Sequence, residues 1–313
     1  MNRPFDMVGV GQNATDTVII VPRYPEYNSK SLFAEERLEA GGQVATAVIA
    51  CRKLGKRCKY IGTVGDDERG RFQLMSLKTS GVDIEDVEVV PGCPNQTAYI
   101  IIDRRTGERT ILWHRDPRLT LKPAMLSRES ICGGRLLHLD AGDLEAAATA
   151  AQWARAAAIP VTCDIDTLYE NMDSLLQHLD YFIASANVPE AYTAEPDPFK
   201  ALEIIRGEFG MKVAAVTLGA DGVLALADSG FLYSPAYEVD AVDTTGAGDV
   251  FRGALCYAVL EEMPLDRALD FSCAAAALNC TKVGARGGAP SLPEVQALMQ
   301  QAGRRVNREY LVR

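Results

Sequence analysis

Histidine is scarce in this chain, with three residues among 313. The eight cysteines include no Cys-x-x-Cys pair, and with so few histidines beside them a zinc cluster is not expected. Most of the cysteines lie inside apolar segments, where a thiol behaves as a small hydrophobe. We therefore expect free, reduced cysteines, as in a cytoplasmic protein.

Long apolar runs and basic charge are also in short supply. No run reaches the roughly 18 residues of a membrane span, and no signal peptide opens the chain. Lys and Arg number 32 against 42 Asp and Glu, so the net charge is −10. An acidic chain is unsuited to nucleic acid or to an anionic membrane surface. A local pocket for an anionic ligand is still compatible with this charge.

Two common nucleotide-binding patterns are missing as well. No glycine-rich loop is followed by the Lys and Ser or Thr of a Walker motif. The segment "GVGQNATD" at 9–16 lacks the glycine spacing of a dinucleotide fingerprint, so a Rossmann-type oxidoreductase is a poor interpretation.

Apolar runs that alternate with amphipathic stretches dominate the chain. Nearly continuous apolar strands separated by helices are typical of a mostly parallel sheet covered on both faces. The length suggests about two domains, although α/β sheets of this size often form one. The predicted strands include 5–11, 135–140, 160–166, 180–185 and 212–219, and the predicted helices include 41–55 and 144–158.

Two segments interrupt this alternation, at about 17–40 and 95–113. The second contains two β-rich runs around the turn "RRTGER", which is a hairpin signal. We predict that the two segments form a small antiparallel sheet apart from the main one, and we call it the lid. Because unpaired sheet edges often pair between subunits, we also expect a homodimer through the lid.

Polar residues cluster where the predicted strands end. In open α/β sheets the ligand lies at the carboxyl ends of the strands, so this edge is the expected site. The residues concerned are Asp16, Asp66, Asp140, Asp164, Asp166, Asn187, Thr217 and Gly219.

The segment "DTTGAGD" at 243–249 precedes a predicted helix. Its glycines therefore lie at a helix N-terminus, where free backbone N–H groups and the helix dipole favour an anion. Asp249 falls in the first turn and is placed to take a proton from a substrate hydroxyl. The plain alternative is an N-cap in which the glycines have no ligand.

With its flanks, this segment reads "DTTGAGDVFRGAL" and resembles the C-terminal signature of the ribokinase-like (PfkB) carbohydrate kinases. "AGGQVATAVIACRKLG" resembles their N-terminal signature, and "NVPE" and "VTLGADG" resemble further family motifs. The resemblance extends over essentially the whole chain. It implies a ribokinase-like three-layer α/β domain over 1–313 with a β-sheet lid, and ATP-dependent phosphorylation of a sugar hydroxyl.

The resemblance also implies roles for individual residues. Asp249 corresponds to the catalytic base, and Gly246, Ala247 and Gly248 to the anion hole. Asn187 and Glu190 would hold Mg²⁺ through water, as suits an ion that keeps several waters. The nucleotide would lie against Asn187, Thr217, Gly219, Ala220, Gly222 and Gly248. A possible K⁺ site comprises Asp243, the Thr245 carbonyl and backbone groups of 279–288, including Gly284 and Gly288.

The expected sugar site departs from the family pattern. It comprises Asp16, Gly41, Gly42, Gln43 and Thr46. The family usually has Asn where Thr46 stands, and Thr cannot donate and accept as an amide does. The segments "LNCT" and "GARGGAP" resemble the ketohexose-type branch, sulfofructose kinases included.

Several alternatives stay open from the sequence. A nucleoside kinase would need an aromatic clamp, for which Tyr99, Trp113 and Phe33 are candidates. Arg115 and Arg118 could meet the charged group of a sugar acid or sugar phosphate, or lie in a solvated loop. A sugar sensor without turnover would not need Asp249. Asp140, Asp143 and Asp166 receive no role.

Overall fold

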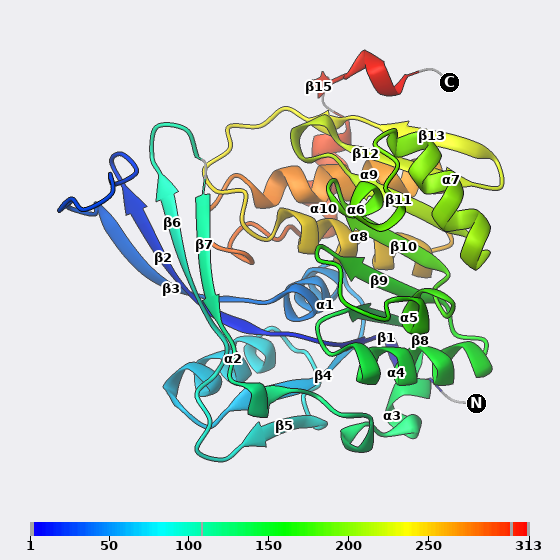
Figure 1. The fold of residues 1–313 in the computed structure, drawn as a ribbon, viewed down its shortest axis with the longest axis horizontal. Helices are drawn as coiled ribbons and strands as arrows, with labels where there is room; N and C mark the ends of the chain where they lie inside the picture. Colours follow the sequence, from blue (N-terminus) through cyan, green and yellow to red (C-terminus); the bar gives the residue numbers. More distant parts are fainter. Residues whose placement is uncertain (1–2, 108, 301–302, 312–313) are drawn as a thin grey trace.

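The apolar and amphipathic segments form strands and helices as the sequence predicts, in a computed structural model that describes residues 3–107, 109–300 and 303–311. A large sheet with helices on both faces forms the main body, and a smaller sheet projects from it (Figure 1). The predicted ribokinase-like architecture is confirmed. Within the described ranges, no helix is long and apolar enough to cross a membrane.

The main sheet contains nine strands in the described part of the chain. Its neighbouring strands run parallel, except that β12 and β13 add to one edge as antiparallel strands. In spatial order the strands are β13 (Gly230–Ser234), β12 (Val223–Ala227), β11 (Val213–Thr217), β10 (Tyr181–Ser185), β9 (Val161–Ile165), β8 (Gly134–Asp140), β1 (Phe5–Val10), β4 (Cys58–Gly65) and β5 (Val87–Val90).

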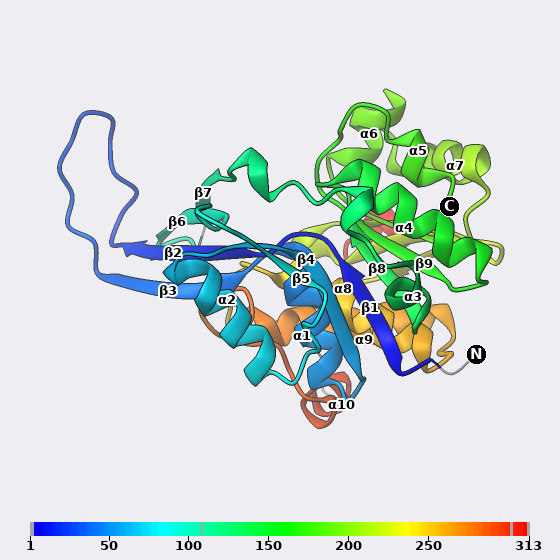
Figure 2. The same ribbon diagram turned by 90° about the horizontal axis from the view of Figure 1, so that it is seen from below.

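Two helical layers cover this sheet because successive side chains of a buried strand point to opposite faces. Met7 of β1 packs into one core and Val8 into the other. The first layer contains α1 (Gln43–Lys53), α2 (Glu68–Thr79), α8 (Ala247–Leu260), α9 (Leu265–Asn279) and α10 (Leu292–Met299). The second contains α3 (Arg128–Cys132), α4 (Leu144–Ala156), α5 (Asp173–Leu176), α6 (Val188–Thr193) and α7 (Pro198–Phe209), on the opposite side in Figure 2.

The lid is a four-stranded sheet in the order β3-β2-β6-β7, as far as the chain is described. Its strands are β2 (Ala14–Val21), β3 (Glu35–Gly41), β6 (Thr97–Asp103) and β7 (Arg109–His114). The predicted small sheet is confirmed, with one difference: β2 and β6 run parallel, while the two outer pairs are antiparallel. The sequence displays only the local hairpin, whereas β2 and β6 are brought together from two separate excursions.

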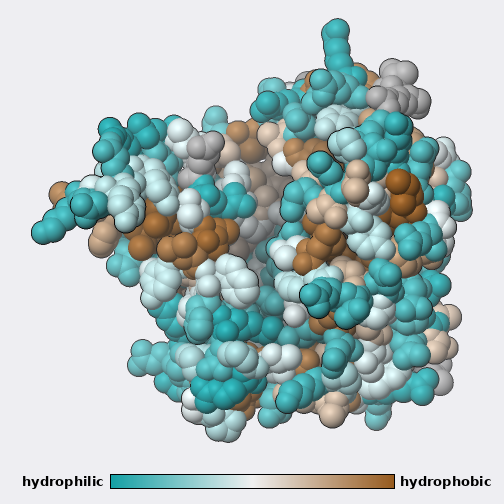
Figure 3. Space-filling view, in the orientation of Figure 1, coloured by the Kyte–Doolittle hydropathy of each residue, from teal (hydrophilic) through white to brown (hydrophobic). Residues whose placement is uncertain are grey.

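The lid stands away from the main body. Figure 2 shows that the loop between β2 and β3 extends beyond its sheet, and Figure 3 shows a hollow between the lid and the main body. A short antiparallel pair, β14 (Ala236–Tyr237) and β15 (Arg304–Arg305), lies apart from both sheets. The hollow is where the candidate site residues gather.

Candidate active site

The start of helix α8 is an open backbone turn. Its N-cap residue, Gly246, has a φ of +73°, and no side chain caps the helix there. A Cβ at Gly246 would lie 2.3 Å from the Ala285 carbonyl oxygen, so only glycine fits against the loop that precedes α10. The Ala247 N–H donates to the Thr244 carbonyl oxygen at 3.3 Å, and the next N–H groups of the first turn of α8 are available to an anion.

A buried arginine lies directly behind this turn. Arg252, one helical turn after Asp249, is 3% exposed and forms an ion pair with Asp164 at the end of β9, with an N–O distance of 2.8 Å. A Cβ at Gly248 would lie 2.6 Å from its Nη1 atom. Arg252 was not among the predicted site residues, although an arginine inside the apolar run of α8 is a visible signal.

Asp249 lies in the first turn of α8 and is half-buried. Withdrawal from solvent raises its pKa to about 6, and the charge of Asp166 adds to the rise. The guanidinium groups of Arg252 and Arg286 act in the opposite direction. A carboxyl group with such a pKa is a competent proton acceptor near neutral pH.

A cavity of about 800 Å³ adjoins this helix start. Gly219 and Gly222, with φ values of +60° and +97°, shape a tight turn after β11, and a Cβ at Gly222 would lie 2.1 Å from the Ser234 carbonyl oxygen. The structure thus brings five predicted nucleotide residues to one cavity. They are Thr217, Gly219, Ala220, Gly222 and Gly248.

Asn187 and Glu190 are not among the residues that line this cavity. Both are exposed, and they follow Ser185 and Ala186, which do line it. Asn187 is the N-cap of the short helix α6, and its side chain forms no capping bond. The two side chains therefore lie beyond the rim of the cavity, open to solvent.

Asp16 and the Gly41–Gly42 turn meet on the lid side of the hollow. Asp16 is 5% exposed, and its Oδ2 atom would lie 2.1 Å from a Cβ at Gly41. Gly42 has a φ of +93°, and a Cβ there would lie 2.2 Å from Cα of Asn13. Burial raises the pKa of Asp16 to about 7, and the charge of Asp249 contributes to the rise. Gln43 begins α1 directly after this turn.

The Thr46 hydroxyl accepts a hydrogen bond from Arg286, a residue that was not among the predicted site residues. Arg286 donates from Nε to Thr46 Oγ1 at 3.1 Å and from Nη1 to Ser76 Oγ at 3.0 Å. Its Nη2 atom donates to the Gly41 carbonyl oxygen. The short Thr46 side chain therefore leaves room for a guanidinium beside the Gly41–Gly42 turn. The sequence signal was one arginine among the glycines of 284–288.

The loop around Asp243 holds the α8 turn in place. Asp243 accepts from the backbone N–H groups of Thr245 and Gly284, both at 2.8 Å. Asn279 donates from Nδ2 to the Thr245 carbonyl oxygen at 3.0 Å. Asn279 Oδ1 and Thr245 Oγ1 are buried and have no hydrogen-bond partner in the described part of the chain. A Cβ at Gly288 would lie 2.3 Å from the Asn279 carbonyl oxygen.

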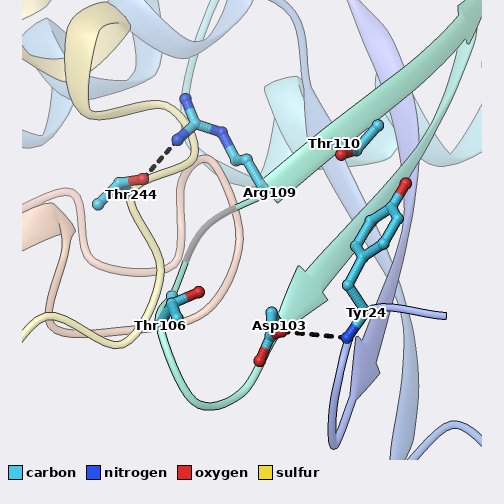
Figure 4. Close-up of a pocket in the computed structure, with 7 residues that line it drawn as sticks. Tyr24, Asp103, Thr106, Arg109, Thr110 and Thr244 are labelled. Carbon is cyan, nitrogen blue, oxygen red and sulfur yellow. Dashed lines mark hydrogen bonds between the residues drawn. The ribbon is translucent and has the colours of Figure 1, made fainter. Parts of the chain in front are cut away.

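The tip of the lid contacts the same loop. Arg109 donates from Nη1 to Thr244 Oγ1 across a second cavity of about 640 Å³ (Figure 4). Asp103, at the end of β6, accepts from the Tyr24 backbone N–H at 3.0 Å. Since Arg109 also lines the larger cavity, the start of β7 lies beside both cavities.

Arg115, Arg118, Asp140 and Asp143 each have an ion-pair or hydrogen-bond partner within the protein. Arg115 forms a two-pronged ion pair with Asp143, with N–O distances of 2.6 and 2.8 Å, and Arg118 pairs with Asp116. Asp140 accepts from the Gln12 backbone N–H at 2.6 Å, and burial raises its pKa to about 7. Among the described residues, no group of three or more His, Cys, Asp or Glu side chains forms a metal site.

Comparison with known proteins identifies the family. The sequence pattern of the family described as "pfkB family carbohydrate kinase" matches residues 7–292. The chain belongs to this family. It is accordingly a sugar kinase, an enzyme that transfers a phosphoryl group to a sugar hydroxyl.

The relatives are named as kinases of several different sugars. The ATP-dependent ribose-1-phosphate kinase of Halopiger xanaduensis is 28% identical over 94% of this chain and 98% of its own. Ribokinase of Haemophilus influenzae is 25% identical over the same shares. Fructokinase-2 of Solanum lycopersicum is 28% identical over 83% of this chain and 87% of its own.

Solved structures agree with this assignment. A protein from Agrobacterium tumefaciens assigned as a ribokinase is 31% identical, with a TM-score of 0.89 over 95% of this chain and 97% of its own. An Escherichia coli protein assigned as ribokinase II, solved with ATP and Mg²⁺, has a TM-score of 0.83 over 95% and 99%. At 22% identity, the second likeness shows the fold.

Proposed function

We propose that the protein transfers the γ-phosphoryl group of ATP to a hydroxyl of a ribose- or ketohexose-type sugar, with Asp249 as the base. The observation that carries the proposal is the geometry of α8. Its uncapped N-terminus opens toward the larger cavity, and its first turn presents Asp249. Asp249 takes the hydroxyl proton, and the amides of Gly246–Gly248 stabilise the charge that develops on the transferred phosphoryl group.

The larger cavity is the proposed ATP site. Thr217, Gly219, Ala220 and Gly222 lie along it, and Gly248 closes its phosphate end. Asn187 and Glu190 offer amide and carboxylate oxygens, which suit Mg²⁺ held through water. When bound there, Mg²⁺ neutralises charge on the phosphate oxygens.

A monovalent cation near Asp243 is the second cofactor proposal. Asn279 Oδ1 and Thr245 Oγ1 are buried oxygens without partners in the described residues, and buried polar atoms usually have one. A K⁺ ion near the backbone of Gly284 and Gly288 would supply it. The cation would brace the loop that carries the α8 turn.

The sugar is proposed to lie over Asp16 and the Gly41–Gly42 turn, with Gln43 and Thr46 behind it. An ionised Asp16 can accept from two hydroxyl groups, which suits a polyol. The buried Gly41 contact fixes the carboxylate at the floor of the site.

The nucleoside alternative gains support from one residue. Strand register places Trp113 in a row with Ala98 and Asp16, on the lid face that turns toward the site. Trp113 is 65% exposed there and could stack on a base. Tyr99 belongs to the opposite face of the same sheet, and Phe33 to the β2–β3 loop.

A substrate panel tests the proposal. Ribose, fructose, ketodeoxygluconate, ribose 1-phosphate and adenosine are each incubated with ATP and Mg²⁺, and both ADP and the phosphorylated product are measured. Stoichiometric sugar phosphate and ADP are expected. Exclusive turnover of adenosine would establish the nucleoside alternative. Tight sugar binding with no product formed from any member would indicate a sensor.

A further inference from the structure

Arg286 is held in a fixed position beside the Gly41–Gly42 turn. Its three protein bonds come from Nε, Nη1 and Nη2 and reach α1, α2 and the end of β3. A guanidinium has five N–H groups, so each terminal nitrogen retains one N–H beyond these bonds. The side chain is buried, and a buried donor without an acceptor is unfavourable.

The Arg286 guanidinium lies close to the proposed reacting region. Arg286 Nη2 bonds the Gly41 carbonyl oxygen, and the Asp16 carboxylate lies against the Gly41 Cα. The guanidinium and the carboxylate therefore meet at one residue, with the Asp249 charge near both. A sugar oxygen at this place would receive hydrogen bonds from Arg286 and donate its own to Asp16.

The surrounding charges disfavour an anionic substituent. Arg115 and Arg252 are the other buried cations near the site, and each is paired, with Asp143 and Asp164 respectively. Arg286 faces Asp16 and Asp249. Glu39 and Asp243 also lie near Asp16, and Arg252 and Arg109 lie near Asp249. A phosphate or carboxylate group on the sugar would add negative charge to a region where acids already predominate.

We propose that Arg286 is a specificity-determining residue of the sugar site, donating hydrogen bonds to an oxygen of an uncharged sugar that Asp16 holds from the other side. This inference rests on the proposed function. It selects the neutral sugar over the sugar phosphate or sugar acid. It also gives a reason for Thr46: a longer amide at that position would fill the space of the guanidinium.

The test compares the parent with Arg286→Gln, Arg286→Lys and Lys282→Gln. Lys282, exposed in the same loop, is the control for loss of one positive charge. The substrates are ribose and ribose 1-phosphate, with ATP and Mg²⁺. We expect the parent to favour ribose in kcat/KM. Arg286→Gln should raise the KM for ribose about 10- to 100-fold, the effect of a hydrogen bond to a charged group.

The KM for ATP separates this role from a general loss of structure, because it should stay within about twofold. Arg286→Lys keeps the charge but loses the fork, so its KM for ribose should be intermediate. Lys282→Gln should match the parent. A folded Arg286→Gln enzyme with parental KM for ribose overturns the inference, as does a parental preference for ribose 1-phosphate that this variant loses.

Failure of the proposed function would be distinguishable from failure of this inference. If the parent turns over no sugar, ribose binding is measured by calorimetry with a non-hydrolysable ATP analogue. Weaker ribose binding by Arg286→Gln, with Lys282→Gln matching the parent, then supports the role of Arg286 without catalysis. Equal binding by all four proteins, or no ribose binding by the parent, refutes it.

Discussion

At the scale of the residue, the candidate site depends on acids withdrawn from water. Burial raises the pKa of Asp16 to about 7 and that of Asp249 to about 6. In the proposed function both groups act through their ionised forms, Asp16 accepting from hydroxyls and Asp249 taking a proton. The nearby arginines offset part of the burial effect, so Arg252 and Arg286 keep these acids usable near neutral pH.

Replacement of the proposed base tests this arrangement directly. Asp249→Asn preserves size but cannot accept the hydroxyl proton, so kcat should fall by about 10²–10⁴, the usual contribution of a general base. Initial rates on the preferred sugar and the thermal midpoint should be measured together. Asp228→Asn, at an exposed position paired with Arg206, is the matched control. Parental turnover in a folded Asp249→Asn enzyme would exclude Asp249 as the base.

The pH dependence follows from the same acids. A carboxyl group with a raised pKa stays protonated, and inactive as a base, until the pH exceeds that value. Since Asp249 and Asp16 have pKa values of about 6 and 7, kcat/KM should decline below about pH 7, and more steeply below about pH 6. A profile from pH 4 to 9 checks this. An acid limb near pH 4, where free carboxyl groups titrate, would contradict it.

Sequence reasoning reached the residues that carry local signals and missed those defined by distant contacts. Asp16 lies within β2, Gly41 ends β3 and Asp249 lies in the first turn of α8, and the structure places them at one hollow. Arg286 contacts Thr46 across 240 positions, and nothing in the spacing of either residue predicts this bond. Arg252 was accessible in principle, because a charge inside an apolar helix face requires a buried partner.

At the scale of the element, the main sheet was predictable because glycines mark the ends of its apolar strand segments. Predicted strands such as 180–185 and 212–219 agree with β10 and β11 to within two residues at each end. The lid was harder, because its central pairing of β2 with β6 joins segments about 80 residues apart. Only the β6–β7 hairpin had a local turn signal.

The contact between the lid and the loop that precedes α8 should affect closure of the lid. Arg109 on β7 bonds Thr244 beside the α8 turn (Figure 4), so Arg109→Ala and Thr244→Val should each lower kcat/KM about 3- to 10-fold. The double variant should lose little more than either single one, since both remove the same bond. Sugar-independent ATP hydrolysis should rise as closure excludes water less well. Fully additive losses in the double-mutant cycle would show that the two residues act separately.

At the scale of the whole molecule, the lid carries a row of exposed apolar side chains, of which Tyr99 lies under the Arg69 guanidinium. Strand register aligns Leu38, Tyr99 and Leu112 across β3, β6 and β7. Their exposed fractions are 48%, 45% and 59%. The β2–β3 loop beside them exposes Tyr27, Leu32 and Phe33. Exposed apolar residues gathered on one sheet typically mark an interface.

We therefore predict a homodimer formed by the lid. Sedimentation at micromolar concentration should give twice the mass of one chain, and Leu112→Glu should shift the protein to monomer, because a carboxylate in the interface must be desolvated. Met75→Glu, on the exposed side of α2, controls for an added charge outside the lid. A monomeric parent would exclude the dimer. A dimer that persists with Leu112→Glu would place the interface elsewhere, and the exposed row would then require a different partner.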